Sequence, residues 1–293
     1  MTTPFTLGAV AYDPKVVTIW EGFKTWLETQ DFAFDFVLYS NYERQVEGHF
    51  RGEYDVAWNS PLAWVQVRRI AEALGRNASG FCMRDTDCDL TSLLVARSDS
   101  GIASLQDLRG KTVGVGAPDS PQATLIPLLA LQEAGLVLGE DVQVRVFDVL
   151  FGKHGDHVGG ERDAARALMA GEIDAAAMID GNHLAFTAEG TLPSGATTIA
   201  FQTPQYDHCI FTALDDVDPV VCERFTELLL AQRYDDPIVR PLLDLEGLKQ
   251  WKPGRLSGFA QLERSVDDLS FSGAQTVRDF IAATIAEHQD GTR

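Results

Sequence analysis

The sequence predicts an α/β fold of two lobes. Strand and helix patterns alternate along most of the 293 residues, which is the order of parallel βαβ units with right-handed crossovers. Two predicted strands end in a Ser-Pro pair, Ser60-Pro61 and Ser120-Pro121, and serine followed by proline is typical of a helix N-terminus. The length favours two domains of roughly 150 residues each. We therefore expect a capped helix after a strand in each lobe.

The first lobe begins with an alternating β pattern and an amphipathic helix. Trp20, Phe23 and Leu27 recur at helical spacing, which predicts that one face of this helix is buried. The elements expected here are strand 5–11, helix 16–29, strand 32–38, helix 42–51, strand 54–58, helix 62–74 and strands 80–83 and 92–97.

The second lobe repeats the alternation. Its expected elements are helix 104–108, strand 112–116, helix 121–134, strand 142–147, helix 161–170, strand 174–179, a short helix from 182 and strand 197–201. Strand 209–214 would rejoin the first lobe, and the remainder to residue 287 is expected to be a helical C-terminal part apart from the loop 249–258.

A chain that leaves one lobe, builds a second and returns has two crossing segments, which together form a hinge. We expect lobe one to comprise 1–96 and 204–293 and lobe two 97–203, with crossings near 92–98 and 202–208. In open α/β sheets ligands collect at the carboxyl ends of the strands, so we expect a ligand cleft between the lobes. A single wide α/β domain is the alternative.

The charge balance argues against polyanionic partners. The chain has 24 basic and 43 acidic residues, a net charge of −19, which repels the phosphates of nucleic acids and anionic lipid surfaces. No apolar stretch reaches the roughly 18 residues that span a bilayer. We expect a small-molecule ligand, no nucleic acid and no membrane insertion.

The N-terminus and the cysteines indicate a compartment. Met1-Thr2-Thr3-Pro4 has no basic region of the kind that begins an export signal. The four cysteines, Cys82, Cys88, Cys209 and Cys222, contain no CxxC pair and fit a reducing environment. We expect a cytoplasmic protein. If the native protein carries an export signal that this sequence lacks, we expect a periplasmic or lipid-anchored protein that works with a membrane permease.

The turn after strand 112–116 is a candidate ligand site. If Ser120 caps the helix and Pro121 is its first residue, the amides of Gln122, Ala123 and Thr124 have no acceptor within the helix. Such amides, together with the helix dipole, could face an anion or a polarised oxygen. We expect one end of the ligand at this turn.

Three segments resemble the phosphate/phosphite/phosphonate-binding proteins of ABC importers. The first is Ser98–Ile102 with Leu105–Lys111, which resembles the entry into lobe two of that family. The second is Gly52–Trp58 followed by Ser60-Pro61, which resembles the family's G-E-x-D-V-A strand and ligand-binding turn. The third is Ala170–Ala177, which resembles the corresponding segment of lobe two. The resemblance covers roughly residues 5–215. It implies a type II periplasmic-binding-protein fold and identifies the chain as a divergent member without a signal peptide.

Two segments depart from the pattern of that family. The second ligand turn there is rich in serine and threonine, whereas here it reads Ser120-Pro121-Gln122-Ala123 and only Ser120 keeps a hydroxyl. The short G-S-H-[D/E]-A approach to a helix is replaced by a longer, glycine-rich loop, and Arg162 stands where the family has histidine. Both changes weaken the expectation of a plain phosphonate ligand.

Histidines and carboxylates suggest two further chemistries. His154, His157 and His208 are candidate metal ligands, and zinc is a metal that such residues suit. His157, His183 and His208 are candidate catalytic acids or bases. A solvated glycine-rich loop, or simple hydrogen bonding to a ligand, explains the same histidines without a metal or catalysis.

Cleft-side aspartates favour a ligand of mixed charge. Asp13, Asp119, Asp156, Asp180 and Asp207 would repel a purely anionic ligand unless they bind a metal or a cationic group. A zwitterion with one end on helix amides and an ammonium on a carboxylate fits better. We expect Asp180, which ends its strand and resembles a pocket position of the family, to hold the ammonium group.

We therefore predict a solute-binding protein for a small polar, anionic or zwitterionic ligand that is phosphonate-like or bears a carboxylate. The alternative is an enzyme on the same fold, metal-dependent or not, using His154, Asp156, His157, His183 and His208. A third hypothesis is a ligand sensor whose closed, ligand-bound state is recognised by a partner. The candidate ligand-binding residues are Tyr12, Trp58, Asn59, Ser60, Asp119, Ser120, Gln122, Ala123, Thr124, His157, Arg162, Asp180, His183 and His208.

Overall fold

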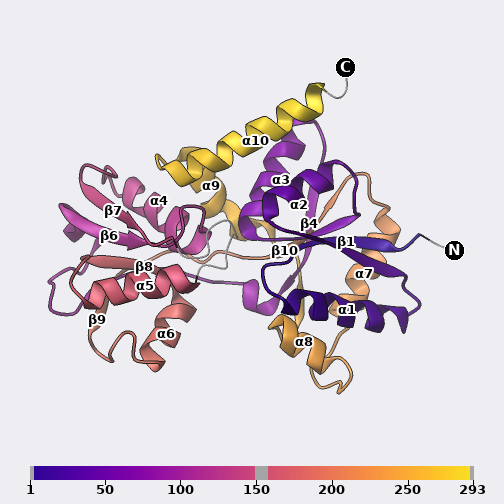
Figure 1. The fold of residues 1–293 in the computed structure, drawn as a ribbon, viewed down its shortest axis with the longest axis horizontal. Coiled ribbons are helices and arrows are strands. Elements are labelled where there is room, and N and C mark those ends of the chain that lie inside the picture. The colour runs from indigo at the N-terminus through magenta and orange to yellow at the C-terminus, as the bar shows by residue number, and fades with distance from the viewer. Residues whose placement is uncertain (1–2, 149–157, 291–293) are drawn as a thin grey trace. The chain divides into compact units, whose positions relative to one another are not determined.

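The structure, a computed structural model, describes residues 3–148 and 158–290 (Figure 1). The chain divides into two compact units. Unit 1 consists of Met1–Cys88, Asp207–Gly258 and Phe280–Arg293, and unit 2 of Asp89–Tyr206 and Phe259–Asp279. In the described part of the chain, no helix is both long and apolar enough to cross a membrane.

Unit 1 is built on a six-stranded sheet with the order β11-β4-β10-β3-β1-β2. Its strands are β1 (Phe5–Val10), β2 (Phe34–Tyr39), β3 (Val56–Asn59), β4 (Ala78–Arg84), β10 (Ile210–Leu214) and β11 (Trp251–Pro253). Its helices are α1 (Lys15–Glu28), α2 (Tyr42–Phe50), α3 (Pro61–Ala73), α7 (Pro219–Leu230) and α8 (Arg240–Glu246), with the 3-10 turns η1 (Asp85–Asp87) and η4 (Leu256–Phe259). Strand β11 falls within the segment 249–258 that was expected to be a loop.

The apolar side chains of β1 are divided between the two faces of this sheet, and helices cover both faces. Phe5, Leu7 and Ala9 belong to the apolar cluster that includes residues of α1, α7 and α8, whereas Val10 belongs to the cluster with α2, α3 and the C-terminal helix α10 (Ser272–Asp290). Figure 1 shows α1 and α8 on one side of β1 and α2 and α3 on the other. Successive strand residues point to opposite faces, so one short strand contributes to both cores.

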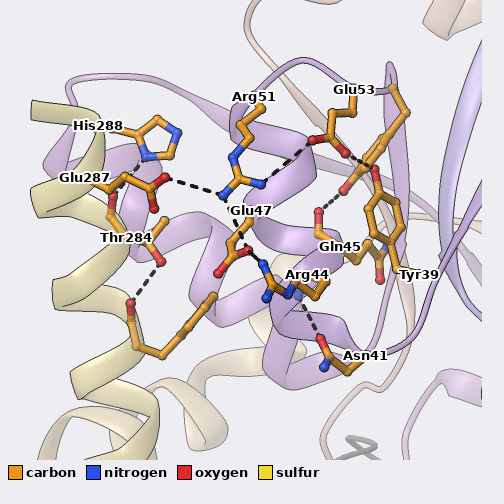
Figure 2. Close-up of polar contacts among 12 residues, drawn as sticks. Tyr39, Asn41, Arg44, Gln45, Glu47, Arg51, Glu53, Thr284, Glu287 and His288 are labelled. Carbon is orange, nitrogen blue, oxygen red and sulfur yellow. Dashed lines mark hydrogen bonds and ion pairs between the residues drawn. The ribbon is translucent and has the colours of Figure 1, made fainter. Parts of the chain in front are cut away.

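The C-terminal half of α10 is fastened to α2 within unit 1. Phe280, Ile281 and Ile285 pack on the cluster that contains α2, and Figure 2 shows Arg51 between the carboxylates of Glu47, Glu53 and Glu287. The Arg51 Nη2 to Glu287 Oε1 distance is 3.4 Å. These ion pairs are solvent-exposed, so apolar packing supplies most of the attachment.

Unit 2 is built on a five-stranded sheet with the order β7-β6-β8-β5-β9. Its strands are β5 (Ser92–Arg97), β6 (Lys111–Val115), β7 (Val142–Val146), β8 (Ala175–Ile179) and β9 (Thr197–Gln202). Its helices are α4 (Ile126–Glu133), α5 (Val158–Met169), α6 (Asp180–Ala188) and α9 (Ala260–Asp268), with the short helices η2 (Leu105–Leu108) and η3 (Pro121–Leu125).

Both sheets are mixed rather than wholly parallel. The expected parallel pairs form between β1, β2 and β3 and between β6, β7 and β8. In contrast, β10 runs antiparallel to β3 and β4, and β5 runs antiparallel to β8 and β9. The antiparallel strands are those next to the chain crossings, where the chain enters or leaves a unit.

The unit boundaries differ from the expected ones at the first crossing and in the C-terminal part. Residues 89–96 were expected in lobe one but belong to unit 2, because β5 pairs with β8 and β9 of that unit. The sequence analysis placed 204–293 wholly in lobe one, but Phe259–Asp279 belongs to unit 2. The reason is specific packing of α9 on α4: Arg264 Nε lies 3.4 Å from Glu133 Oε1. In addition, the Gln132 amide donates to the carbonyl of Asp268 at 2.9 Å and accepts from the amide of Ser270 at 2.9 Å.

Candidate functional site

In unit 1, the turn after β3 has the predicted cap. Ser60 Oγ accepts the amide of Ala63 at 3.1 Å, and Pro61 is the first residue of α3. Ser60 and Asn59 are both completely buried. Asn59 Nδ2 has no hydrogen-bond partner among the described residues, so this amide is able to donate to a ligand.

Gln45 ties the carboxyl ends of β1 and β3 together beneath that turn. Its Nε2 donates to the carbonyls of Gly8 at 2.9 Å and Trp58 at 3.0 Å, and it lies 3.4 Å from Asn59 Oδ1. Gly8 is required at this place because a Cβ there would lie 2.4 Å from the ring of Tyr54. Contacts between segments far apart in the sequence therefore build a hydrogen-bonded, polar strand end in unit 1.

Two aromatic residues predicted to contact ligand lie against the core of unit 1. Trp58 is 6% exposed, and its ring centroid lies 4.6 Å from that of Phe211 and 5.8 Å from that of Trp251. Tyr12 is half-buried against the apolar clusters, with Lys15 Nζ 5.8 Å from its ring centroid. These contacts give Trp58 a packing role.

In unit 2, the turn after β6 has the predicted cap but a different first turn. Ser120 Oγ accepts the amide of Ala123 at 3.2 Å, and Pro121 begins the helix. The first turn, η3, is π-helical, and the amides of Thr124 and Leu125 both donate to the carbonyl of Ser120, at 3.2 and 2.9 Å. The expected cradle of three free amides is therefore wrong, because those of Ala123 and Thr124 are already engaged.

The remaining groups of this turn are held by neighbours. Thr124 Oγ1 donates to the carbonyl of Ala117 at 2.7 Å. The hydroxyl of Ser92 donates to the carbonyl of Gln122 at 2.5 Å and lies 2.7 Å from the hydroxyl of Tyr206. Gln122 is 4% exposed, so its side chain is the part of the turn that faces the polar interior of unit 2.

A carboxylate that sequence reasoning missed lies in this interior. Glu161, in the first turns of α5, is completely buried. Its Oε2 accepts the amide of Ile179 at 2.9 Å and Nδ2 of Asn182 at 2.8 Å. Its Oε1 lies within hydrogen-bond distance of no donor in the described part of the chain. Burial raises the pKa of Glu161 to about 7, and the side chain of Gln122 opposes that shift.

Gly160 allows the first turn of α5 to lie close to the backbone that follows β6 and β7. A Cβ on Gly160 would lie 2.4 Å from the carbonyl oxygen of Phe147 and 3.7 Å from the Cα of Gly116, so only glycine fits there without displacing the backbone. The next residue, Glu161, is thereby delivered to the carboxyl ends of β6 and β8. In parallel strands these ends are where ligands bind.

A helical spacing in the sequence marks Glu161 as inward-facing. Ala164, Ala165 and Leu168 follow it by three, four and seven residues and are all buried, which is the period of a single helix face. Arg162, predicted to bind ligand, points elsewhere. It pairs with Glu189 at 2.9 Å, and its guanidinium lies 4.9 Å from the ring centroid of Phe186.

Asp180 joins the same polar cluster as Glu161. Its Oδ2 accepts the hydroxyl of Thr91 at 2.8 Å, and Oδ1 accepts the amide of Gly181 at 2.7 Å. Burial raises the pKa of Tyr206, and the charges of Glu161 and Asp180 raise it further. Asp119, in the turn between β6 and η3, is half-buried. The polar cluster of unit 2 is thus acidic and built from several strand ends.

The histidines predicted as one site are distributed differently. His183 Nε2 lies 3.3 Å from Thr197 Oγ1, and burial lowers the pKa of His183. His208 belongs to unit 1, where its Nδ1 lies 3.4 Å from Asp87 Oδ1 and 3.2 Å from Cys209 Sγ. His154, Asp156 and His157 lie outside the described residues, so their predicted roles stay predictions.

One surface groove lies away from both capped turns. It occupies about 550 Å³ on unit 1 and is lined by residues that include Phe81, Val217, Cys222 and Leu230. Its lining contains neither Ser60 nor Asn59. Its lining also includes Asp215, Glu223 and Glu227, and none of the residues predicted to bind ligand.

Comparison with known proteins gives a family match over most of the chain. The family model described as "ABC transporter, phosphonate, periplasmic substrate-binding protein" matches residues 8–261.

Three solved structures from different bacteria illustrate the similarity of fold. XAC2383 of Xanthomonas citri, bound to ATP, is 18% identical with a TM-score of 0.67, over 95% of this chain and 99% of that one. PhnD1 of Prochlorococcus marinus, in complex with methylphosphonate, is 18% identical with a TM-score of 0.62, over 90% and 97%. PA3383 of Pseudomonas aeruginosa, a binding protein component of an ABC phosphonate transporter, is 14% identical with a TM-score of 0.57, over the full length of both. At these identities the likeness shows the two-lobed α/β fold.

Proposed function

Since the chain belongs to the phosphonate-binding family of ABC-transporter periplasmic substrate-binding proteins, we propose that its ligand is a small zwitterion with an anionic group and an ammonium group. A solute-binding protein of this type binds a small molecule without transforming it. A membrane permease is the proposed partner.

The observation that carries the proposal is the buried carboxyl of Glu161. Oε2 accepts the hydrogen bonds of Ile179 and Asn182, and the side chain of Gln122 lies against the same carboxyl, whereas Oε1 has no hydrogen-bond partner in the described part of the chain. An ionised carboxylate repels a phosphonate or carboxylate ligand at close range. The same oxygen is well suited to accept from a ligand ammonium, which would also hold the carboxyl in its ionised form.

Asp180 supports the same assignment from a neighbouring position. It is anchored by Thr91 and Gly181, so its carboxylate is oriented before any ligand arrives. Gln122 is the proposed contact for the anionic group, because its side-chain amide carries two N–H donors. Phosphonate and carboxylate are both compatible with these donors.

The enzymatic alternative receives no specific support from the described residues. It draws on His154, Asp156, His157, His183 and His208, of which the first three lie outside the described residues. His183 contacts Thr197, and His208 contacts Asp87 and Cys209. Binding of a zwitterion explains the acidic cluster without a catalytic step.

Calorimetric binding with two matched ligand pairs tests the proposal. The first pair is ethylphosphonate and 2-aminoethylphosphonate, and the second is propionate and β-alanine. We expect the aminated member of at least one pair to bind about tenfold or more tightly, since a hydrogen bond to a charged group contributes about 1.5–3 kcal/mol. Glu161→Gln should remove that preference, and Asp180→Asn should reduce it.

Glu172→Gln is the matched control. Glu172 pairs with Arg145 on the surface of unit 2, so the preference should persist in this variant. Equal affinity for both members of each pair, or an unchanged preference in Glu161→Gln, would refute the proposal. If no probe binds, native mass spectrometry of freshly purified protein identifies a retained molecule, and a retained ligand without a cationic group contradicts the assignment.

A further inference from the structure

Three side chains of metal-binding type meet in unit 1. Asp87, His208 and Cys209 each offer a ligand atom, and these atoms lie within 4.8 Å of one another. Asp87 ends η1, just after β4, and the other two residues immediately precede β10. The amide of His208 donates to the carbonyl of Asp87 at 2.8 Å, which holds the two segments together.

Two of the three separations match those around a tetrahedral ion, and the third, between the ligand atoms of Asp87 and Cys209, lies within 4.8 Å. His208 Nδ1 lies 3.2 Å from Cys209 Sγ and 3.4 Å from Asp87 Oδ1. Zinc bonds of about 2.0–2.3 Å to oxygen, nitrogen and sulfur place neighbouring ligand atoms about 3.3–3.6 Å apart. An ion could therefore enter with shifts of only a few tenths of an ångström in these side chains.

The burial of the three groups suits an ion that has lost most of its water. The side chain of Asp87 is 3% exposed, whereas that of His208 is 14% exposed, and Cys209 is buried. The imidazole side is thus the route of entry. Imidazole, thiolate and a single carboxylate together favour zinc over calcium or magnesium, which take oxygen ligands.

The guanidinium of Arg84 is a positive charge beside Asp87, and it opposes the binding of a second cation there. Its Nε donates to Asp87 Oδ2 at 2.5 Å and its Nη2 to Oδ1 at 2.9 Å. A carboxylate oxygen accepts two bonds, so the guanidinium leaves Oδ1 one lone pair for an ion beside His208. Arg84 also pairs with Glu246 at 3.2 Å. Ionised Asp87, Glu246 and Cys209 would then balance the guanidinium and a divalent cation.

We propose that Asp87, His208 and Cys209 form a binding site for a thiophilic divalent cation of the zinc class, through Oδ1, Nδ1 and Sγ. A water molecule completes the tetrahedron. On binding, the Sγ–H bond breaks, the metal–sulfur bond forms and the proton passes to solvent, with no change of oxidation state. Arg84 orients the carboxylate from behind, as outer-shell groups do in metal sites.

Cobalt titration of the whole, reduced chain tests this site. We expect near-stoichiometric Co²⁺ binding with a thiolate-to-cobalt charge-transfer band, release of about one thiol proton per ion, and displacement of Co²⁺ by Zn²⁺. Zn²⁺ should also raise the melting temperature, because it binds the folded state. Cys209→Ser should abolish the band, and both Cys209→Ser and His208→Gln should weaken binding about tenfold or more.

Cys88→Ser and Cys222→Ser are the matched controls, and both should keep the band and the affinity. Circular dichroism without metal checks that each variant folds. If Cys209→Ser does not fold, His208→Gln decides the result, because the His208 side chain is less deeply buried than that of Asp87. The proposal is overturned if the native protein gives no thiolate band, or if His208→Gln binds as tightly as the native chain. It is also overturned if His157→Ala, rather than His208→Gln, removes binding.

Discussion

Asn182 Nδ2 donates to Glu161 Oε2 at 2.8 Å in the interior of unit 2. This bond joins the first turns of α5 and α6, and the amide of Ile179 donates to the same oxygen at 2.9 Å. A buried carboxyl group is therefore held in one orientation at the ends of β6 and β8. The arrangement has consequences for stability as well as for ligand choice.

Glu161 should make the protein less stable as the pH rises. Burial raises its folded-state pKa from 4.5 to about 7, so between these values the folded chain binds more protons than the unfolded chain. The free energy of unfolding therefore falls as the pH increases through this window. Glu161→Gln cannot titrate, and its stability relative to the native chain should increase by roughly 2–3 kcal/mol between about pH 5 and about pH 8.

Urea unfolding of both chains across this pH range measures the difference. Glu172→Gln, an exposed change in the same unit, should follow the native curve. A constant difference between Glu161→Gln and the native chain would contradict the raised pKa.

His49 should make the protein less stable as the pH falls, whereas Glu161 makes it less stable as the pH rises. Burial lowers its pKa from 6.5 to about 4, and its ring stacks on Tyr54 at 4.9 Å between centroids. Below pH 6.5 the unfolded chain takes up the proton first, so stability falls as the pH decreases toward 4. At about pH 5 this loss is roughly 2 kcal/mol relative to neutral pH. His49→Leu should lack it, as denaturant titrations at both pH values will show; equal losses in both chains would disprove the assignment.

The buried pair of Arg84 and Asp87 should respond to mutation far more than an exposed pair of the same kind. The side chain of Asp87 is 3% exposed, and Asp87→Asn leaves a buried guanidinium with less compensation, which costs about 3–5 kcal/mol. Arg233 and Asp235 also pair side by side but are 77% and 73% exposed. Asp235→Asn should cost less than about 1 kcal/mol. Thermal or urea unfolding of the two variants gives the comparison, and similar losses would show that burial is not the cause.

Loss of the Ser120 cap should destabilise unit 2. Ser120 Oγ accepts the amide of Ala123 at 3.2 Å, and removing such a cap costs about 1 kcal/mol, up to about 2. Ser104 precedes η2 without capping it, so Ser104→Ala should cost less than about 0.5 kcal/mol. Hydrogen exchange of amides in α4 is the readout: faster exchange is expected in Ser120→Ala only, and unchanged exchange there would count against the cap.

Apolar packing, more than charge, should hold α10 on unit 1. Arg51 pairs with Glu287 in exposed positions (Figure 2), so Arg51→Gln should change the unfolding free energy by less than about 1 kcal/mol. Ile281 packs on the α2 cluster, and Ile281→Ala should cost about 1–2 kcal/mol through lost apolar burial. Unfolding at low and high salt separates the two contributions. A larger loss in Arg51→Gln, strongly dependent on salt, would reverse the ranking.

Local patterns determined the order of the elements and both capped turns. Ser60 and Ser120 cap their helices as predicted because serine before proline acts within one turn of chain. The inward position of Glu161 was also encoded locally, in the spacing of Ala164, Ala165 and Leu168, although the family resemblance drew attention to Arg162 instead. Strands 92–97 and 209–214 were recognised as strands, but their antiparallel pairing depends on partners far along the chain.

Only the tertiary structure decided which groups meet. Asp87 and His208 are separated by more than a hundred residues, and packing of β4 beside β10 is what brings them together. Residues Phe259–Asp279 joined unit 2 because α9 found partners on α4, a choice that periodicity does not record. The sequence by itself thus specified a two-unit α/β protein with capped strand ends, since those features arise from nearest neighbours. The acidic cluster and the thiol-imidazole-carboxylate cluster arise from long-range packing, which brings residues from separate strands to one strand end.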